Sequence, residues 1–564
     1  MTTERSAPFL DPTRLVGGGP TAFTRATERL LLFLDANDIR NIDGPGDEGG
    51  DILARLRNAR WVFQTKWTSH ATIDRKGVEQ ADAAKAFYRA DRAVLVTNAT
   101  ESADARKRRA QLRSVGSRID LWDGDTLVKF GEQVIPDWPP SRIHGDRLRP
   151  YQRAAVGKAR VELDRSRRAL VVLATGLGKT VAAGEVIAAF LAEHPDADVL
   201  VVAHQKELVG QLERALWRHL PKSVPTQLLN GDQRPPQLSG VTCATVQSAL
   251  RVVREDAYRP GLVVVDEAHH VSASGTYADL LAALCEVPQL GVTATPWRGD
   301  RYDLAHHFGE PVFRMGIADG MAAGYLADVD YRLLVDEDLD WEDVHEASEL
   351  RLTIKDLNHK LFLPQRDDEI ADHIRAVWEE TVQPRAIVFC RTINHAEEFA
   401  QLLRERGWPR AHVLSNRQSK RERNILMSEF ADGRVPIICA VDVLNEGVDV
   451  PDVNILCFLR VTHSRRIFVQ QLGRGLRLRP DKTRVVVLDF VSDIRRIAAT
   501  INLKRDLERL ADEDIERLRL PNSSFTFNRP EVGTLLDEWI KDAASLEDSD
   551  EEVKLQFPRT DLAG

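Results

Sequence analysis

The sequence predicts an α/β protein in which two parallel-sheet domains follow a smaller α+β domain. Between about residues 165 and 500, short apolar, β-branched runs alternate with helical patterns. Runs that are apolar along their whole length are typical of parallel strands covered by helices on both faces. They are too many for one sheet of ordinary width, so they indicate two sheets. The segment before residue 145 has a separate pattern of helices and strands.

Length and composition agree with several globular domains. The chain has 564 residues, of which 43% are hydrophobic and 29% charged, and such a chain can bury sizeable cores. Its net charge of -9 excludes a uniformly basic protein that coats nucleic acid, so nucleic-acid contacts must come from local basic patches. No cysteine pair has metal-ligand spacing, and no apolar run is long enough for a membrane span or a signal peptide. We therefore expect a cytoplasmic protein without a membrane partner.

Changes in composition indicate where the domains meet. Residues 136–150 form a linker rich in Pro and Arg, and residues 335–349 are acidic and lack strong strand runs. The C-terminal segment is acidic as well, which favours a solvated tail. We expect an N-terminal domain, two sheet domains and a tail at residues 1–145, 146–330, 331–525 and 526–564.

A glycine-rich loop follows the first strand of the first sheet, which is expected at residues 169–173. The loop reads Ala-Thr-Gly-Leu-Gly-Lys-Thr at residues 174–180 and opens a helix at residues 181–193. Glycines let backbone amides approach a phosphate without a clashing Cβ, and the helix N-terminus adds a favourable dipole. The residues expected to bind the nucleotide here are Thr175, Gly176, Gly178, Lys179 and Thr180.

Two carboxylates follow another buried strand and complete the expected ATP site. The apolar run at residues 262–265 leads into Asp266 and Glu267, which places both acids at the sheet edge where ligands bind. We expect Lys179 to neutralise the β- and γ-phosphates, and Thr180 and Asp266 to hold Mg²⁺. Glu267 would polarise the attacking water. ATP and Mg²⁺ are therefore the expected cofactors.

The loop and the acidic pair resemble motifs I and II of superfamily 2 helicases. Further segments match the remaining motifs in order, at residues 148–152, 203–208, 244–248, 293–296, 387–390, 445–451 and 470–477. The resemblance covers roughly residues 146–500 and implies two RecA-like motor domains that close on ATP. It assigns adenine recognition to Gln152 and nucleotide contacts to Gly447 and Asp449. Arg474 and Arg477 become arginine fingers, which stabilise the charge of the transition state.

The residues of these motifs are most similar to those of type I and type III restriction motors and XPB-like repair helicases. That group acts mostly on duplex DNA, so the resemblance favours DNA over RNA as the partner. Contacts to the backbone would be indifferent to base sequence and weakened by salt. The sequence contains no recognisable wedge, so translocation along a duplex and strand separation both remain open.

The N-terminal domain carries a second group of polar residues. A segment rich in Gly and acids ends at Asp51, and a strand is expected at residues 61–67. Alternation along that strand places Gln64 and Lys66 on one face, and a hairpin would bring Asp51 near them. Asp51 and Gln64 could hold Mg²⁺, while Lys66 could orient or deprotonate a water molecule. These three residues are the expected catalytic residues for phosphodiester hydrolysis.

This pattern resembles the Mrr-like branch of the PD-(D/E)xK restriction endonucleases. The match consists of Gly-Asp-x-Gly-x-Asp at residues 46–51 followed by Gln-x-Lys, with a later strand at residues 93–98. Glu28, on a helix expected at residues 22–34, matches a position that sometimes assists the metal. Gln64 stands where most members of the wider family carry Asp or Glu. The resemblance implies a Mg²⁺-dependent endonuclease, and a domain that only binds DNA is the alternative.

The two parts together predict an ATP-dependent DNA helicase or translocase coupled to an endonuclease, of the restriction or antiviral defence kind. No methyltransferase signature such as Asn-Pro-Pro-Tyr is present, so recognition would need additional defence-system subunits. Two alternatives stay open. One is a repair or remodelling helicase whose N-terminal domain only grips DNA, and the other is a nucleic-acid-stimulated ATPase switch that recruits a partner through its acidic tail.

Overall fold

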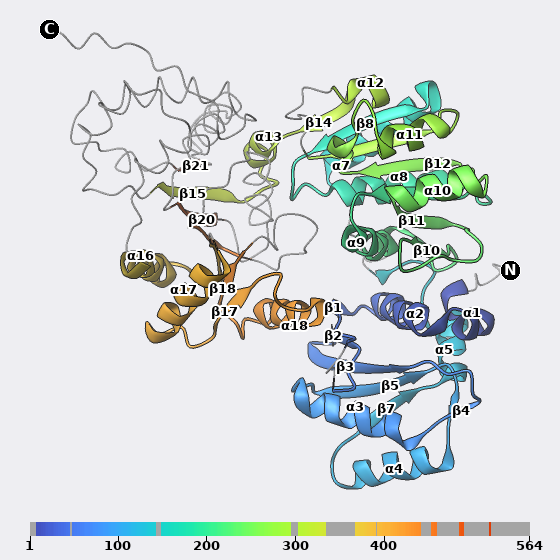
Figure 1. Cartoon of the computed structure of the whole chain (residues 1–564), viewed down its shortest axis with the longest axis vertical. Helices are drawn as coiled ribbons and strands as arrows, with labels where there is room; N and C mark the ends of the chain where they lie inside the picture. The colour runs from blue at the N-terminus through green and yellow to red at the C-terminus, as the bar shows by residue number, and fades with distance from the viewer. Residues whose placement is uncertain are drawn as a thin grey trace.

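The computed structural model describes residues 7–44, 48–140, 142, 148–294, 303–333, 367–390, 392–441, 453–459, 484–489 and 518–519. These residues form three main sheets (Figure 1). One sheet of five strands precedes two sheets of seven strands, and every strand pair in the two larger sheets is parallel. The predicted α/β class, with two parallel sheets after an α+β domain, is confirmed.

The N-terminal domain is a mixed sheet with helices on both faces. Its strand order is β1-β2-β3-β5-β7, antiparallel across β1, β2 and β3 and parallel beyond. Apolar residues of α2 pack on one face and those of α3 and α4 on the other. The elements are η1 (Pro8–Leu10), α1 (Pro12–Gly17), α2 (Gly19–Phe33), β1 (Asn37–Asn41), β2 (Ile52–Leu56), β3 (Ala59–Lys66), β4 (Thr72–Ile73), α3 (Arg75–Phe87), β5 (Arg92–Thr97), β6 (Thr100–Glu101), α4 (Ala103–Ser114), β7 (Ile119–Trp122), α5 (Gly124–Lys129) and η2 (Phe130–Val134).

A two-residue turn fixes the register of the β2–β3 hairpin. Arg57 and Asn58 both have positive φ, at 52° and 60°, which is the conformation of a type I′ turn and matches the twist of paired strands. The hairpin therefore aligns Ile52 with Phe63. One residue further, the backbone N–H of Asp51 donates to the carbonyl of Phe63 at 2.9 Å. This register carries Asp51 to the position opposite Gln64.

The second sheet and its helices form a unit that we call lobe 1. Its order is β10-β11-β9-β12-β13-β8-β14, and the strand residues pack alternately into two cores on opposite faces. The elements are α7 (Pro150–Ser166), β8 (Arg168–Leu173), α8 (Lys179–Glu193), β9 (Val199–Ala203), α9 (Lys206–Leu216), η3 (Trp217–His219), β10 (Thr226–Leu229), β11 (Val241–Thr245), α10 (Val246–Glu255), β12 (Leu262–Asp266), η4 (Ala268–His270), α11 (Thr276–Ala283), β13 (Gln289–Thr293), α12 (Ala305–Phe308), β14 (Pro311–Met315) and α13 (Ile317–Ala322).

The third sheet, with the order β17-β18-β16-β19-β20-β15-β21, belongs to lobe 2. Strand β15 pairs with β20 along six residues, so the strand that crosses the expected boundary at 330/331 lies wholly in lobe 2. The acidic segment 335–349 and the tail fall outside the described residues. The elements are β15 (Asp328–Leu333), α16 (Asp367–Glu380), β16 (Ala386–Phe389), α17 (Ile393–Glu405), β17 (Ala411–Leu414), α18 (Lys420–Ala431), β18 (Ile437–Ala440), β19 (Ile455–Phe458), β20 (Arg484–Asp489) and β21 (Leu518–Arg519).

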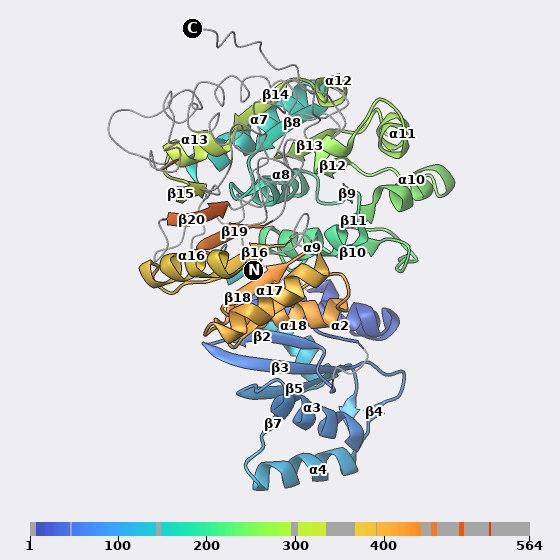
Figure 2. The ribbon, with the colours of Figure 1, turned by 60° about the vertical axis from the view of Figure 1, so that its left-hand side comes forward.

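The N-terminal domain lies against both lobes. Figures 1 and 2 show α2 beneath α9 of lobe 1, and α18 of lobe 2 alongside β1 and β2. A side-chain contact supports this arrangement, since Ile425 of α18 packs against the core of the N-terminal domain. Among the described residues, no helix combines the length and the apolar character that crossing a membrane requires.

Candidate functional site

The predicted phosphate loop connects β8 to α8, at the carboxyl edge of the lobe 1 sheet. Gly176 and Gly178 have φ of 92° and 84°, a region that disfavours other residues. A Cβ on Gly178 would lie 2.6 Å from Nε2 of Gln152, so the loop has no room for a side chain there. Oγ1 of Thr175 is buried and has no hydrogen-bond partner among the described residues. A close-packed glycine loop with an unsatisfied hydroxyl fits a phosphate group.

This geometry predicts the effect of one methyl group. Gly178→Ala adds a Cβ at a positive φ, which costs about 1–3 kcal/mol, and also meets Gln152. We expect ATP binding to weaken about tenfold or more, since 1.4 kcal/mol corresponds to a factor of ten. Titration with a fluorescent ATP analogue measures the change. Gly157→Ala is the matched control, because a Cβ on Gly157 meets nothing within 4 Å; equal affinities in the two variants would contradict the prediction.

Lys179 and Glu267 lie in contact at the ends of β8 and β12. Nζ of Lys179 donates to Oε1 of Glu267 at 2.6 Å, with both side chains largely buried. Burial alone would raise the pKa of Glu267, but Lys179 and His269 outweigh it and lower that pKa below its ordinary value. Burial and the charge of Glu267 raise the pKa of Asp266 to about 7, against the opposing effect of Lys179. Lys179 and His269 therefore keep Glu267 ionised, while Asp266 is protonated more readily than a free aspartate.

His269 connects Glu267 to the segment at residues 293–296, which matches another helicase motif. Nδ1 of His269 lies 3.0 Å from Oγ1 of Thr293, and both side chains are buried. The same nitrogen lies 3.3 Å from Oε2 of Glu267. His269 thus joins the end of β12 to the end of β13. Thr295 and Pro296, the rest of that motif, lie outside the described residues.

Gln152 packs against the phosphate loop from the start of α7. Its Nε2 donates to the carbonyl of Leu177 at 3.1 Å, and its Oε1 accepts from the backbone N–H of Arg149 at 3.0 Å. The hydroxyl of Tyr151 donates to the same Leu177 carbonyl at 2.8 Å. Sequence reasoning missed Tyr151, although it directly precedes Gln152. Adenine recognition by Gln152 stays a prediction.

Four predicted ATP-site residues lie outside the described part of the chain. They are Gly447, Asp449, Arg474 and Arg477. The described residues therefore define the lobe 1 side of the expected nucleotide site, and the arginine-finger assignment stays a prediction.

The hairpin of the N-terminal domain brings Asp51 and Gln64 together. Oδ2 of Asp51 accepts from Nε2 of Gln64 at 3.0 Å, from Oγ1 of Thr65 at 2.7 Å and from the backbone N–H of Thr65. Both Asp51 and Gln64 are buried. Thr65 was not expected from the sequence, because alternation directs it to the opposite face of β3. Lys66 is the last residue of β3, and its side chain lies against Gly77 of α3. A Cβ added to Gly77 would be 3.5 Å from Cγ of Lys66.

The donor set at Asp51 fits a hard divalent cation. Oε1 of Gln64 is buried without a hydrogen-bond partner among the described residues, and it belongs to the residue that touches the Asp51 carboxylate. Carboxylate and amide oxygens are ligands that such cations accept. The described residues contain no cluster of three or more His, Cys, Asp or Glu side chains able to hold a metal. A cation here would need DNA or water oxygens to complete its coordination.

Glu28 occupies a different environment from the one that the resemblance suggested. The residue is completely buried, and its carboxylate accepts from Nε of Arg214 at 2.6 Å and from Nδ2 of Asn41 at 3.0 Å. Arg214 belongs to lobe 1. The carboxylate expected to assist a metal thus forms an ion pair with a guanidinium of the motor.

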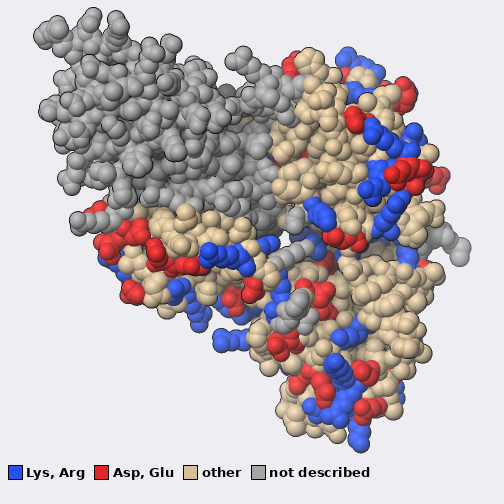
Figure 3. All heavy atoms as spheres, in the orientation of Figure 1, with Lys and Arg blue, Asp and Glu red and all other residues tan. Residues whose placement is uncertain are grey.

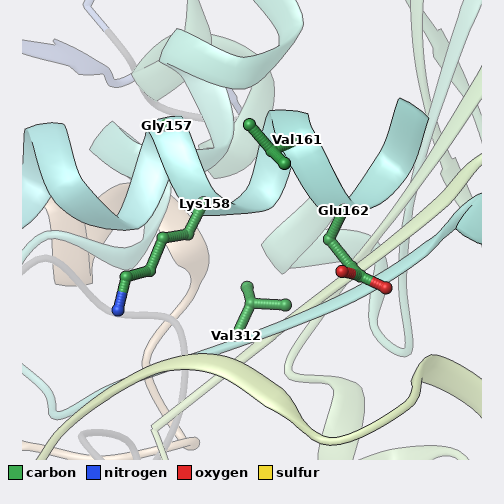
Figure 4. A pocket seen from close by; sticks show the side chains of 5 residues that line it. All are labelled: Gly157, Lys158, Val161, Glu162 and Val312. Atoms are coloured by element: carbon green, nitrogen blue, oxygen red, sulfur yellow. The ribbon is translucent and has the colours of Figure 1, made fainter. Parts of the chain in front are cut away.

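Two hollows occur in the described surface. One, of about 390 Å³, lies between α7 and β14 and contains none of the predicted site residues; Figure 4 shows its lining, which is Gly157, Lys158, Val161, Glu162 and Val312. The other, of about 400 Å³, lies beside the Asp51 centre. Its lining, from the segment before Asp51 and from α3, is Glu48, Gly49, Lys76, Glu79, Gln80 and Ala83.

Comparison with known families assigns three parts of the chain. Residues 18–130 match the model of a restriction endonuclease family with an Mrr catalytic domain. Residues 146–298 match the res subunit of type III restriction enzymes, and residues 368–479 match the helicase conserved C-terminal domain. These families use ATP in the motor and a divalent metal in the nuclease. The first matched region of the motor runs from α7 to β13 of lobe 1, and the second includes α16 to β19 of lobe 2.

Individual relatives agree with these assignments. The chain is 28% identical over 320 residues to a 51.5 kDa protein of a Lactococcus phage, covering 55% of this chain and 63% of that protein. It is 24% identical over 462 residues to the endonuclease subunit of the type I restriction enzyme EcoAI of Escherichia coli, covering 74% and 55%. A solved type ISP restriction-modification enzyme, LlaBIII bound to DNA, shares the fold with a TM-score of 0.53 at 17% identity, covering 94% of this chain and 42% of that chain.

The matches extend over only part of each relative's length. The chain spans 51–63% of the length of three of its curated relatives. The chain thus carries a region that matches an Mrr restriction endonuclease family, followed by regions that match the res subunit of type III restriction enzymes and the helicase conserved C-terminal domain.

Proposed function

We propose that the chain is an ATP-dependent DNA translocase or helicase coupled to a Mg²⁺-dependent endonuclease, and that it acts in restriction or phage defence. One observation carries this proposal. A single chain brings Lys179 into contact with Glu267 at a phosphate loop, and Asp51 into contact with Gln64 in a restriction-endonuclease domain. The motor would move the nuclease along DNA to its cleavage site.

In the motor, Lys179 exchanges partners during the ATP cycle. An arriving γ-phosphate competes with Glu267 for Nζ of Lys179, because the phosphate carries the greater charge. Glu267, released and ionised, then accepts a hydrogen bond from the water that attacks the γ-phosphorus. Thr180 and Asp266 would hold Mg²⁺, which neutralises developing phosphate charge. Arg474 and Arg477 of lobe 2 would contact the γ-phosphate as the lobes close.

His269 contacts Glu267 and also Thr293, in the segment at residues 293–296 that matches a helicase motif, and we propose that it couples ATP hydrolysis to strand movement. We expect His269→Ala to reduce strand displacement more than ATP hydrolysis, because the link from Glu267 to Thr293 is lost. The coupling of one such residue is worth about tenfold. Phosphate release and triplex displacement, measured on the same sample, give the displacement per ATP. His194→Ala, on an exposed site of lobe 1, is the control, and an equal loss in both readouts would contradict the prediction.

In the nuclease domain, Asp51 and Gln64 would supply oxygen ligands for Mg²⁺. When bound, the metal neutralises the scissile phosphate and makes its water more acidic. Lys66 orients or deprotonates that water for attack on phosphorus, and the 3′-oxygen leaves with a proton from solvent.

The proposed partner is duplex DNA, together with separate subunits that recognise sequence or modification. On the face drawn in Figure 3, Lys and Arg side chains form local groups among Asp and Glu side chains. Such groups suit backbone contacts that depend on salt. The cytoplasmic location expected from the sequence remains a prediction.

The test of this function is plasmid cleavage by the full chain with Mg²⁺ and ATP. We expect cleavage that a chelator abolishes and that needs hydrolysable ATP for its full rate. Absence of cleavage on methylated and unmethylated DNA, with strand displacement intact, would instead favour the repair or remodelling helicase. DNA-stimulated ATP hydrolysis without displacement of a triplex or unwinding would favour the ATPase switch.

A further inference from the structure

The N-terminal domain is held by lobe 1 through charged groups of α2. Arg25 forms a two-point ion pair with Glu213, whose side chain is 1% exposed. Glu28 accepts from Nε and Nη2 of Arg214 at 2.6 and 3.2 Å. Breaking a buried pair leaves an uncompensated charge and is costly. Helix α2 must therefore follow α9 when lobe 1 moves.

Lobe 2 holds a different part of the same domain. Nδ2 of Asn424 on α18 donates to the carbonyl of Asn41 in β1 at 2.7 Å. Oγ of Ser428 donates to Oδ2 of Asp38 at 3.2 Å. These contacts join the beginning and the end of β1 to α18, and they involve neutral donors. Strand β1 is therefore attached to lobe 2, while α2 is attached to lobe 1.

The two attachments meet inside the domain. Nδ2 of Asn41 donates to Oε1 of Glu28 at 3.0 Å. A continuous row of hydrogen bonds thus runs from Arg214 of lobe 1 through Glu28 and Asn41 to Asn424 of lobe 2. We call these four residues the interlobe row. Any change in the distance between α9 and α18 acts on this row.

The interlobe row adjoins the nuclease centre on two sides. One turn before Glu28 on α2, Oγ1 of Thr24 is hydrogen-bonded to Oγ1 of Thr65 at 2.9 Å, and Thr65 donates to Asp51 at 2.7 Å. Next to Asn41, the backbone N–H of Ile42 donates to the carbonyl of Asp51 at 2.7 Å. Asp51 is thus held by α2 through its side chain and by the β1 end through its backbone.

We infer that Glu28 and Arg214 are positioning residues of the nuclease, and that the interlobe row makes the placement of Asp51 depend on the nucleotide state of the motor. This inference rests on the proposed function. Closure of the lobes on ATP moves α2 with lobe 1 and β1 with lobe 2, and Asp51 lies between the two. Glu28 acts through Asn41 and through α2, without touching the metal or the DNA.

Two variants test the row from its two ends in the full chain. Asn424→Ala removes the lobe 2 end of the interlobe row and leaves no buried charge, while the contacts of Ser428 with Asp38 and of Asp432 with Arg55 and Arg60 remain. Arg214→Lys keeps the charge and loses the two-point contact. Matched controls are Gln401→Ala on α17, and Arg254→Gln in an exposed pair of lobe 1. The readout is Mg²⁺-dependent plasmid cleavage with and without ATP, alongside phosphate release. A merely structural role would not change the ratio of the two cleavage rates.

In the wild type and both controls, we expect ATP to change the cleavage rate by about tenfold or more, within the usual range of coupling between sites. In Asn424→Ala and in Arg214→Lys this response should fall to about threefold or less, while phosphate release stays at the wild-type level. An undiminished ATP response in both variants would overturn the inference.

Hydrogen exchange separates this inference from the proposed function. The amides of Ile42 and Thr65 should change protection when a non-hydrolysable ATP analogue and duplex DNA are added, and the change should disappear in Asn424→Ala. If the wild type cleaves no DNA but shows this response, the endonuclease proposal fails and the inference stands. If neither amide responds in the wild type, or Asn424→Ala responds like the wild type, the inference fails whatever the cleavage result.

Discussion

Replacement of Lys179 by alanine is expected to reduce DNA-stimulated ATP hydrolysis about 10²- to 10³-fold, the usual loss when one group that stabilises transition-state charge is removed. Lys179 is the cation of the phosphate loop and also the partner of Glu267 at 2.6 Å. The variant loses phosphate neutralisation and leaves Glu267 without its lysine. Phosphate release with saturating duplex DNA measures the effect, and thermal unfolding checks that the fold persists.

Lys158→Ala is the control for this prediction. Lys158 lies on the same lobe, on the exposed side of α7 beside the hollow of Figure 4. Its replacement by alanine removes one positive charge, as the replacement of Lys179 does. Hydrolysis by Lys158→Ala should match the wild type. If Lys179→Ala retained more than about a tenth of the wild-type rate, the assignment of the phosphate loop would be wrong.

The second large effect is expected at the nuclease centre, where Asp51→Asn should reduce plasmid cleavage about 10²- to 10³-fold. The substitution keeps the size of the side chain but removes the negative charge that a divalent cation needs. An amide would also oppose the donors that Gln64 and Thr65 direct at Oδ2 of Asp51. Cleavage is followed as conversion of supercoiled plasmid at several Mg²⁺ concentrations, and DNA-stimulated ATP hydrolysis should remain at the wild-type rate.

Asp74→Asn provides the comparison within the same domain. Asp74 precedes α3 and its side chain makes no capping hydrogen bond, so neutralising it should leave cleavage unchanged. Isothermal titration with Mg²⁺ adds a readout that does not depend on cleavage, and Asp51→Asn should bind the metal more weakly than Asp74→Asn. Equal cleavage by both variants would remove Asp51 from the proposed mechanism.

Much of the fold could be predicted from the sequence because most inner strands of the two lobes are short and buried along their whole length. The run at residues 169–173, for example, became β8 with one additional residue. Leu173, which stands where a stricter phosphate-loop pattern requires glycine, is fully buried in the strand. The Asp51–Gln64 contact could also be predicted, because it follows from a hairpin with a two-residue turn and from the alternation of side chains along a strand.

Contacts between distant segments could not be predicted in this way. Glu28 and Arg214 are separated by 186 residues, and neither carries a local pattern that identifies the other as a partner. The role of Thr65 was hidden for a related reason. Alternation assigns it to the opposite face from Gln64, but at the end of a strand the Asp51 carboxylate reaches around the backbone to both residues.

The burial of Arg29 limits how freely this nuclease domain can be exchanged among motors. Its guanidinium donates to the carbonyls of Val224 and Pro221 in lobe 1 at 2.9 and 3.1 Å, while Phe9 lies 4.5 Å from it on the other side. A motor deprived of the domain would expose those carbonyls, and a domain deprived of the motor would leave the charge of Arg29 unsupported. Grafting either part onto a foreign partner therefore requires redesign of the surface around Arg29.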